Sequence, residues 1–470
     1  AVSISVALNT GLFKSAGDAT KNWKSAQEAE ANVGSEIKIG DKTYASIDDY
    51  LNNNPMSTIK INMEVTHEDT AVTADGTNIK SIEHGVPIPV GYSYVTGEKN
   101  TGVVIQDDDT RDQFVWVPVL QNQKIKIEIE TKEEVTEIKI EDPLGTLITK
   151  NSENNDITVS GKANTSIINP TTNGEYTVTV KTASDEASKT LYVKSLYAQD
   201  ITSMRDLYLA IIKEQANEQN ITEDEVAKAL TEGQCNTVEE LVNTIKQMMQ
   251  QYTDSDIATH GGSVNKYGGF YIARYEAGCN NRRKGGDSIE NVTVYSQANK
   301  YPYNYISQTD SITKAAEMNN EKTNVTASLI NSAVWDRTMN WLEETNAVTR
   351  AELFDSTSWG NYNNSKFNFT GKYSTDYGAN FTEAPAATEK PENSSYLLGT
   401  GVTDYTKRNN IYDLAGNCCE WTTESSSSGD RVVRGGLYDG NGSVSPAYFR
   451  VGNSPGNNLV SFRSTLYVNL

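Results

Sequence analysis

Residues 410–417 read NIYDLAGN, residues 420–422 read EWT, and the motifs RGG and SFR follow at 434–436 and 461–463. Glycines permit close approach of the backbone, and large aromatic side chains carry enough apolar area to fix long loops. Tyr, Gly and Asn are abundant around these motifs, and regular periodicity is sparse. The pattern predicts a body of long loops attached to a small sheet. We expect Arg434 and Arg463 to take part in structural ion pairs or in hydrogen bonds to the backbone.

Two earlier stretches complete this pattern. WVPV at 116–119 and GGFYIARYE at 268–276 are apolar runs of strand length, and we expect them to be consecutive strands of one fold. WDRTMNWL at 335–342 predicts a helix that carries two tryptophans, and STSWGNY follows at 356–362. Residues 120–255, which lie between these two strands, would then be an insertion into this fold or a long excursion before it closes.

Together, these motifs resemble the formylglycine-generating-enzyme superfamily, a variant of the C-type lectin fold. Several separate motifs occur in the order that the superfamily shows. The resemblance implies that residues 256–470 form a C-type-lectin-like domain, and we expect this domain to bind a ligand. The whole chain is then an α+β multidomain protein.

The cysteines argue against oxidase chemistry. The resemblance implies that an enzyme of this superfamily would hold copper with two cysteines near its C-terminus, but this chain has no cysteine after Cys419. Adjacent cysteines such as Cys418 and Cys419 cannot easily share a metal or form an unstrained disulfide. We therefore expect no enzymatic activity and no catalytic cofactor. A formylglycine-generating-type oxidase is the disfavoured alternative, and a disulfide from this pair to Cys279 stays open.

Asn417 and Glu420 are the candidate metal ligands. The resemblance implies a structural calcium ion near this loop, and an amide and a carboxylate supply the oxygen ligands that calcium prefers. Backbone carbonyls would have to complete the set. The three histidines are scattered along the chain, so a histidine-based metal site is not expected.

Residues 437–460 are the candidate ligand-binding segment, and they read LYDGNGSVSPAYFRVGNSPGNNLV. The segment has neither a helical nor a strand period. Antibody paratopes favour similar residue types, because Tyr gives rigid amphipathic contacts and small polar residues adapt to the partner. An ordinary irregular loop is the alternative interpretation, since Gly and Asn are also common in turns.

The segment 437–460 also resembles the variable region of diversity-generating-retroelement target proteins, which share the lectin fold. In those proteins, adenine-directed mutagenesis changes Asn codons. Every residue type in the segment can be reached from the codon AAC, whereas Lys, Glu, Gln, Met and Trp are absent and cannot be reached. The resemblance implies a hypervariable surface between the fixed motifs RGG and SFR, with Tyr438, Tyr448 and Phe449 as anchors. The predicted ligand-binding residues are Leu437, Tyr438, Asp439, Asn441, Ser443, Val444, Ser445, Tyr448, Phe449, Val451, Asn453, Ser454, Asn457, Asn458, Leu459 and Val460.

Residues 1–34 predict a single helix, with Gly34 as its C-cap. NTGLFKSA at 9–16 resembles the start of type IV pilin-like proteins of Gram-positive bacteria, where an apolar membrane helix leads into such a stretch. The resemblance implies that an N-terminal anchor was processed or truncated, and that the helix contacts other pilin subunits. Any contact with a membrane would be made through that missing anchor. The alternative for residues 1–8 is the start of an ordinary buried helix.

The middle of the chain divides into three predicted parts. Residues 35–120 form a small β-rich region that ends in the first strand of the lectin-like fold. Residues 121–198 predict an immunoglobulin-like β-sandwich. NGEY at 173–176 resembles the turn into a late strand of bacterial immunoglobulin-like modules, and the resemblance implies a spacer or an adhesive stalk. Residues 199–255 form a helical insert with a capping box at Thr222–Glu225. The predicted strands of the sandwich are Lys124–Glu130, Val135–Glu141, Thr146–Thr149, Asp156–Ser160, Tyr176–Val180 and Lys189–Val193.

Length and charge limit the partners. A chain of 470 residues is too long for one core, and its formal net charge of -21 would repel nucleic acid. No stretch reaches the roughly 18 apolar residues of a membrane span. We therefore predict a pilin-like adhesin or receptor, displayed on the cell surface, on a pilus or outside the cell, that binds a protein or glycan ligand. A phage receptor-binding protein with the same variable tip is a further alternative.

Overall fold

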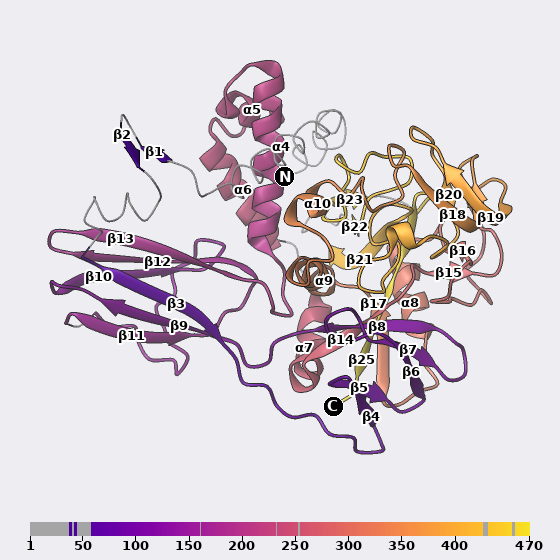
Figure 1. Ribbon diagram of the computed structural model, residues 1–470, viewed down its shortest axis with the longest axis horizontal. Coiled ribbons are helices and arrows are strands. Elements are labelled where there is room, and N and C mark those ends of the chain that lie inside the picture. Colours follow the sequence, from indigo (N-terminus) through magenta and orange to yellow (C-terminus); the bar gives the residue numbers. More distant parts are fainter. Residues whose placement is uncertain are drawn as a thin grey trace.

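The computed structural model describes residues 37–39, 42–44, 58–159, 161–231, 233–251, 254–425, 431–453 and 456–470. The predicted helix 1–34 and the predicted site residue Ser454 lie outside these ranges. The chain is a mixed α and β protein with several antiparallel sheets and few helices. Its two larger parts are a sandwich of strands and a main body, which we define as residues 67–118 and 254–470 (Figure 1). None of the helices in the described ranges is both long and apolar enough to cross a membrane.

A six-stranded sheet forms the centre of the main body. Its strands lie in the order β17 (Val325–Leu329), β25 (Ser464–Val468), β14 (Gly269–Ala273), β8 (Gln113–Pro118), β7 (Val104–Asp107) and β6 (Tyr92–Thr96). Strands β8 and β14 pair antiparallel, with Trp116 opposite Tyr271. This register confirms the prediction that the two apolar stretches are neighbouring strands, although the sandwich and several helices separate them in the chain.

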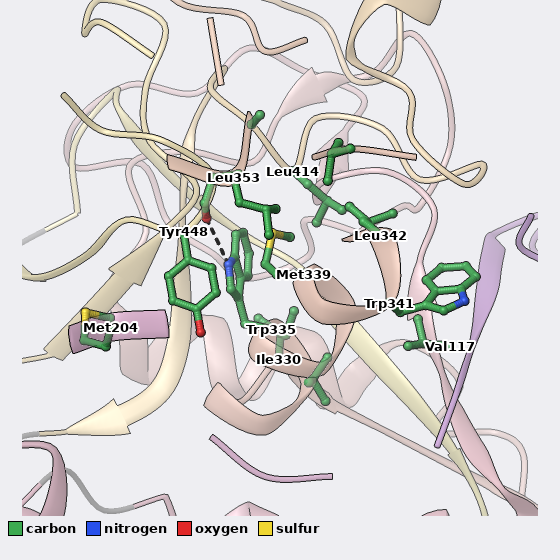
Figure 2. Packing of buried hydrophobic residues seen from close by; sticks show 14 of the residues in the cluster. Val117, Met204, Ile330, Trp335, Met339, Trp341, Leu342, Leu353, Leu414 and Tyr448 are labelled. Carbon is green, nitrogen blue, oxygen red and sulfur yellow. Dashed lines mark hydrogen bonds between the residues drawn. The ribbon is translucent and has the colours of Figure 1, made fainter. Parts of the chain in front are cut away.

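Alternate residues of this sheet enter two separate cores, as the two-residue period of a strand requires. On one face, Val117 packs in a cluster with Trp335 and Trp341 (Figure 2). On the other face, Trp116 packs with Tyr271 in a second cluster. Because both faces are covered, the strands β8 and β14 are nearly continuous apolar runs.

The sandwich consists of two three-stranded antiparallel sheets with one shared core. One sheet has the order β10 (Val135–Glu141), β12 (Gly174–Thr182), β13 (Glu186–Val193), and the other has the order β11 (Ala163–Ile168), β9 (Lys124–Glu130), β3 (Lys60–Thr66). Ile125, Ile127 and Ile129 alternate into the core, where they meet Tyr176 and Val178. The predicted bounds of β9 and β10 are confirmed.

Other local predictions for the sandwich are wrong. The predicted strands at 146–149 and 156–160 form only isolated bridges in their described part, Glu141 with Leu147 and Lys150 with Asp156. Strand β11 was not predicted, because its first four residues, Ala163–Ser166, are small or polar and give no apolar alternation in the sequence. The predicted start of the sandwich at residue 121 is also wrong. Strand β3 precedes residue 121 in the chain but belongs to the sandwich, because it pairs along the whole length of β9. A pairing between distant strands has no local signature in the sequence.

Helices α4 (Ile201–Gln219), α5 (Glu223–Leu230) and α6 (Val238–Gln251) follow the sandwich (Figure 1). The predicted capping box is confirmed at the start of α5, where Thr222 and Glu225 cap each other. Helix α4 begins after Asp200, whose carboxylate accepts a hydrogen bond from the Ser203 amide. Helix α7 (Ser255–Tyr267) then leads into β14 and contacts β25.

The rest of the main body consists of short elements joined by long loops. They are β4 (Ile79–Glu83), β5 (Val86–Pro89), β15 (Gly278–Cys279), β16 (Tyr301–Pro302), α8 (Gln308–Glu317), α9 (Ser332–Glu344), α10 (Arg350–Phe354), β18 (Phe367–Ser374), β19 (Thr382–Lys390), β20 (Leu397–Leu398) and the 3-10 turn η2 (Asp404–Thr406). Helix α9 confirms the predicted helix at 335–342. The strands β1 (Ile37–Ile39) and β2 (Lys42–Tyr44) pair with each other near the start of the described chain.

Candidate ligand-binding surface

A second sheet of the main body carries the segment 437–460. Its strands lie in the order β23 (Arg450–Asn453), β22 (Arg431–Arg434), β21 (Cys419–Ser425) and β24 (Val460–Phe462). Strand β21 pairs antiparallel with β22 and parallel with β24, so Glu420 lies between Arg434 and Ser461. The segment 437–460 therefore begins after β22, on one side of β21, and ends at β24, on the other side. We call these its leaving end and its returning end.

Arg463 fixes the returning end of the segment. Its guanidinium group and the Glu420 carboxylate are fully buried, and Nη2 lies 2.5 Å from Oε1 while Nε lies 2.9 Å from Oε2. The remaining donors reach the carbonyl oxygens of Ala273 and Tyr412, each at 2.9 Å. One side chain thus links β24 to β21, to the end of β14 and to the loop that precedes β21.

Arg434 fixes the leaving end. Its Nη2 donates to Asp336 of α9 at 2.6 Å, and its Nε donates to the carbonyl oxygen of Phe449 at 3.1 Å. The guanidinium group lies over the rings of Trp335 and Tyr448. Figure 2 shows Tyr448 beside Trp335, whose indole nitrogen donates to the Ala447 carbonyl at 3.0 Å. These contacts confirm the structural role that the sequence predicted for both arginines.

Asn417 and Glu420 do not form an open calcium site. Both oxygens of Glu420 accept hydrogen bonds from Arg463. The Asn417 side-chain oxygen accepts from the Asn361 amide group at 2.9 Å and from the Leu398 backbone at 3.0 Å. The Asn417 amide nitrogen donates to Glu276. Because these oxygens are already engaged, the two residues do not fit the calcium ion implied by the resemblance. Within the described ranges, no group of three His, Cys, Asp or Glu residues is placed to hold a metal.

Gly436 marks the point where the segment turns away from β22. Its φ is +77°, and a Cβ atom there would lie 1.9 Å from the Ser445 carbonyl oxygen. A side chain at this position would meet both an unfavourable backbone conformation and a backbone atom. The RGG motif is therefore explained by close packing of the segment against itself. The segment is also more regular than predicted, since residues 450–453 pair with β22 as strand β23.

The prediction that Tyr438 and Tyr448 are exposed anchors is wrong. Both side chains have 0% exposure. Tyr448 closes the core beside Trp335, and the Tyr438 hydroxyl accepts a hydrogen bond from the Asn458 amide group at 2.8 Å. Phe449 is buried as well. Large aromatic groups gain most from burial. Leu437, Val451 and Leu459 of the same segment are partly buried against the second core cluster.

The other predicted residues divide by exposure. Asn441 is exposed, and burial raises the pKa of the half-buried Asp439. The half-buried side chains are Leu437, Asp439, Val444, Val451, Asn457, Asn458 and Leu459. Ser443, Ser445 and Val460 are buried, and Asn453 ends strand β23. Asn441 and the half-buried residues define what we call the accessible set.

Two loops of the accessible set meet at one place. The bond between Tyr438 and Asn458 joins the loop after β22 to the loop before β24. The Asn457 carbonyl also accepts a hydrogen bond from the Tyr305 amide at 2.9 Å. Beside them, Tyr377 is 56% exposed, and its ring centroid lies 6.3 Å from that of Tyr438. Tyr305 and Tyr377 were not predicted, because nothing local in the sequence places them against the segment.

All four cysteines are buried and free. The disulfide from Cys279 to the pair Cys418 and Cys419, which the sequence left open, is not formed. Burial raises the pKa of the Cys279 thiol to about 11, so this thiol stays protonated near neutral pH. Burial also raises the pKa of Cys418 well above its usual range.

Comparison with known proteins gives two weak structural likenesses. No known protein family and no curated protein matches the chain. A solved structure described as the crystal structure of CarF covers 43% of this chain and 87% of its own, with 13% identity and a TM-score of 0.28. Treponema denticola variable protein 1 covers 43% of this chain and 96% of its own, with 14% identity and a TM-score of 0.21. At these scores, neither likeness defines the fold or the function of this chain.

Proposed function

We propose that this protein is a surface-displayed adhesin or receptor that binds a protein or glycan ligand through the accessible set of the segment 437–460. The observation that carries the proposal is the contrast between the ends of the segment and its loops. Arg434 and Arg463 hold the two ends through buried ion pairs, Arg434 with Asp336 of α9 and Arg463 with Glu420 of β21. Between them, the loops present small, polar and aliphatic side chains at the surface.

The composition of the accessible set supports diversification. Its members are Asn, Asp, Val and Leu, all of which can be reached from an AAC codon. Changes at these positions would leave the two buried ion pairs in place. Tyr can also be reached from an AAC codon, but Tyr438 and Tyr448 are buried. We therefore propose that they support the loops and do not contact the ligand.

The remaining parts fit the same proposal. We infer that the main body is a C-type-lectin-like binding domain without catalytic activity, and that the sandwich is an immunoglobulin-like spacer. The pilin-like N-terminal segment 1–34 would attach the protein to a cell surface or a pilus. Ligand binding in this proposal requires neither a metal ion nor an organic cofactor.

Sequencing of the DNA around the gene tests the diversification. We expect a gene for a reverse transcriptase and a near-copy of the stretch that encodes 437–460, with differences only at adenines of the copy. If no such copy is present, the diversification part of the proposal fails.

A display library tests the binding surface directly. One library would place NNC codons at Asp439, Asn441, Asn457 and Asn458, and a matched library would place them at the buried residues Ser443, Ser445, Tyr448 and Val460. We expect the first library to remain folded and to yield specific binders to a panel of unrelated proteins. We expect the second to lose folded protein. Equal loss of folded protein in both libraries would contradict the assignment of the accessible set.

A further inference from the structure

Trp341 has a buried indole nitrogen without a partner. The side chain is 2% exposed, and no acceptor for its Nε1–H exists within the part of the chain that the structure describes. Three other buried indoles each donate to a carbonyl oxygen, Trp335 to Ala447, Trp359 to Glu352 and Trp421 to Ile306, at 2.9 to 3.0 Å. A buried donor left unpaired costs free energy, and the described residues supply no acceptor for Trp341.

The side chain of Trp341, which carries the unpaired nitrogen, lines a cleft. The cleft has a volume of about 560 Å³, and its lining includes Lys99, Asn100, Pro118, Leu120, Trp341 and Glu344. Sites for small ligands commonly fall in a range of about 300 to 1,000 Å³. In Figure 2, Trp341 lies at the edge of the cluster near Val117, and its nitrogen is on the side of the ring that faces away from Trp335. None of the described residues that line the cleft belongs to the segment 437–460, so the cleft is separate from that segment.

The charges of the cleft favour an anion. Glu344 is neutralised by Arg337, whose Nη1 and Nη2 donate to the two carboxylate oxygens at 2.9 and 2.8 Å. Lys99 is the exposed cation of the lining, and it makes no ion pair or hydrogen bond within the described residues. An ammonium group and an indole N–H are both donors without acceptor capacity. Pro118 and Leu120 add apolar surface beside them.

We propose that this cleft binds a small carboxylate that carries an apolar chain. The carboxylate accepts hydrogen bonds from Trp341 and interacts with Lys99, and the chain packs against Pro118 and Leu120. The cleft also touches Leu120, which lies between β8 and β9, and Ser195, which lies between β13 and α4. This site is independent of the surface proposed for the larger ligand.

The test follows the indole N–H signals of the full chain labelled with ¹⁵N-tryptophan. The Trp341 signal is assigned by its loss in Trp341→Phe, and the protein is then titrated with hexanoate and with its neutral counterpart hexanamide. We expect hexanoate to shift the Trp341 signal in a saturable manner and hexanamide to shift it much less. The Lys99→Gln variant should bind hexanoate about two- to fivefold more weakly, because one exposed charge contact is lost.

The expected pattern distinguishes the site from general binding. The signals of Trp335, Trp359 and Trp421 should remain in place, since these indoles already donate to carbonyl oxygens. The proposal is overturned if hexanoate leaves the Trp341 signal unchanged, if hexanamide shifts it equally, or if Lys99→Gln binds hexanoate as tightly as the parent chain.

Discussion

Tyr448 lies against Arg434, with the guanidinium carbon 5.5 Å from the centre of the phenol ring. Trp335 covers the same guanidinium group at 5.7 Å, and Asp336 accepts its hydrogen bond. Tyr448, a residue of the candidate ligand-binding segment, thus packs around Arg434, which holds one end of that segment. Burial raises the pKa of the Tyr448 hydroxyl well above its usual range, so this group is neutral at any physiological pH.

Replacement of Tyr448 should therefore affect stability and not only binding. We expect Tyr448→Ala to lower the free energy of unfolding by about 3 to 5 kcal/mol, because it removes a fully buried aromatic side chain. The matched control is Asn441→Ala at an exposed position of the same segment, for which we expect a change within about 0.5 kcal/mol. Denaturation in urea, followed by circular dichroism, measures both. A Tyr448→Ala chain as stable as the control would contradict the burial of this side chain.

Gly436 should be the least replaceable residue of the RGG motif. We expect Gly436→Ala to cost at least about 3 kcal/mol, because the added Cβ combines a positive φ with contact to the Ser445 carbonyl oxygen. Gly440→Ala is the control, since a Cβ there would meet the Ser445 hydroxyl, which can rotate away. Its expected cost is below about 1 kcal/mol. Similar costs for the two variants, measured by thermal unfolding, would show that the segment does not pack as described.

Much of the main body could be predicted from the sequence, because its signals are local. The apolar runs around Trp116 and Tyr271 have the length and pattern of buried strands. Their pairing has no local signal and was expected only from the resemblance that the order of the motifs carries. Outside the main body, the capping box of α5 at Thr222 and Glu225 was predictable as well, because it depends only on residues three positions apart. Such features need no knowledge of distant partners.

The candidate site was less predictable, because the same residue types occur in exposed binding loops and in buried cores. Tyrosine is frequent both in binding loops and in cores, so the sequence could not distinguish the buried Tyr438 and Tyr448 from exposed anchors. The prediction of calcium ligands was wrong for a related reason. Glu420 reads as a metal ligand in the sequence, but Arg463, over forty positions away along the chain, takes both of its oxygens.

The ion pair between Arg463 and Glu420 should show strong coupling. We expect Arg463→Met to lower the free energy of unfolding by about 3 to 5 kcal/mol, since it leaves a buried carboxylate without its counter-charge. The double variant with Glu420→Met should recover part of this loss, which gives a coupling energy of about 1 to 3 kcal/mol in a double-mutant cycle. The same cycle on the exposed pair Lys407 and Asp404 should give less than about 1 kcal/mol. Equal coupling in both cycles would contradict the buried position of the first pair.

Asp254 should make the stability depend on pH between about 4 and 6. Burial raises the pKa of this carboxyl from 3.8 to about 6, although Ser332 and Thr423 donate hydrogen bonds to it. Between these two pKa values, the folded chain holds a proton that the unfolded chain releases. The contribution of Asp254 to stability is therefore present at low pH and is lost as the pH rises to about 6.

The substitution Asp254→Asn should remove this dependence. An amide does not titrate, so the stability of the variant relative to the parent chain should improve by roughly 2 to 3 kcal/mol from pH 4 to pH 7. The cost of the altered hydrogen bonds does not depend on pH, so it cancels in this difference. The contributions of the other carboxyl groups also cancel, because both chains contain them. Asp112, whose pKa burial raises to about 6, allows the same comparison through Asp112→Asn at a different place in the main body. Urea denaturation at several pH values measures the two differences. A stability difference between variant and parent that stays the same from pH 4 to pH 7 would mean that folding does not shift the pKa of Asp254.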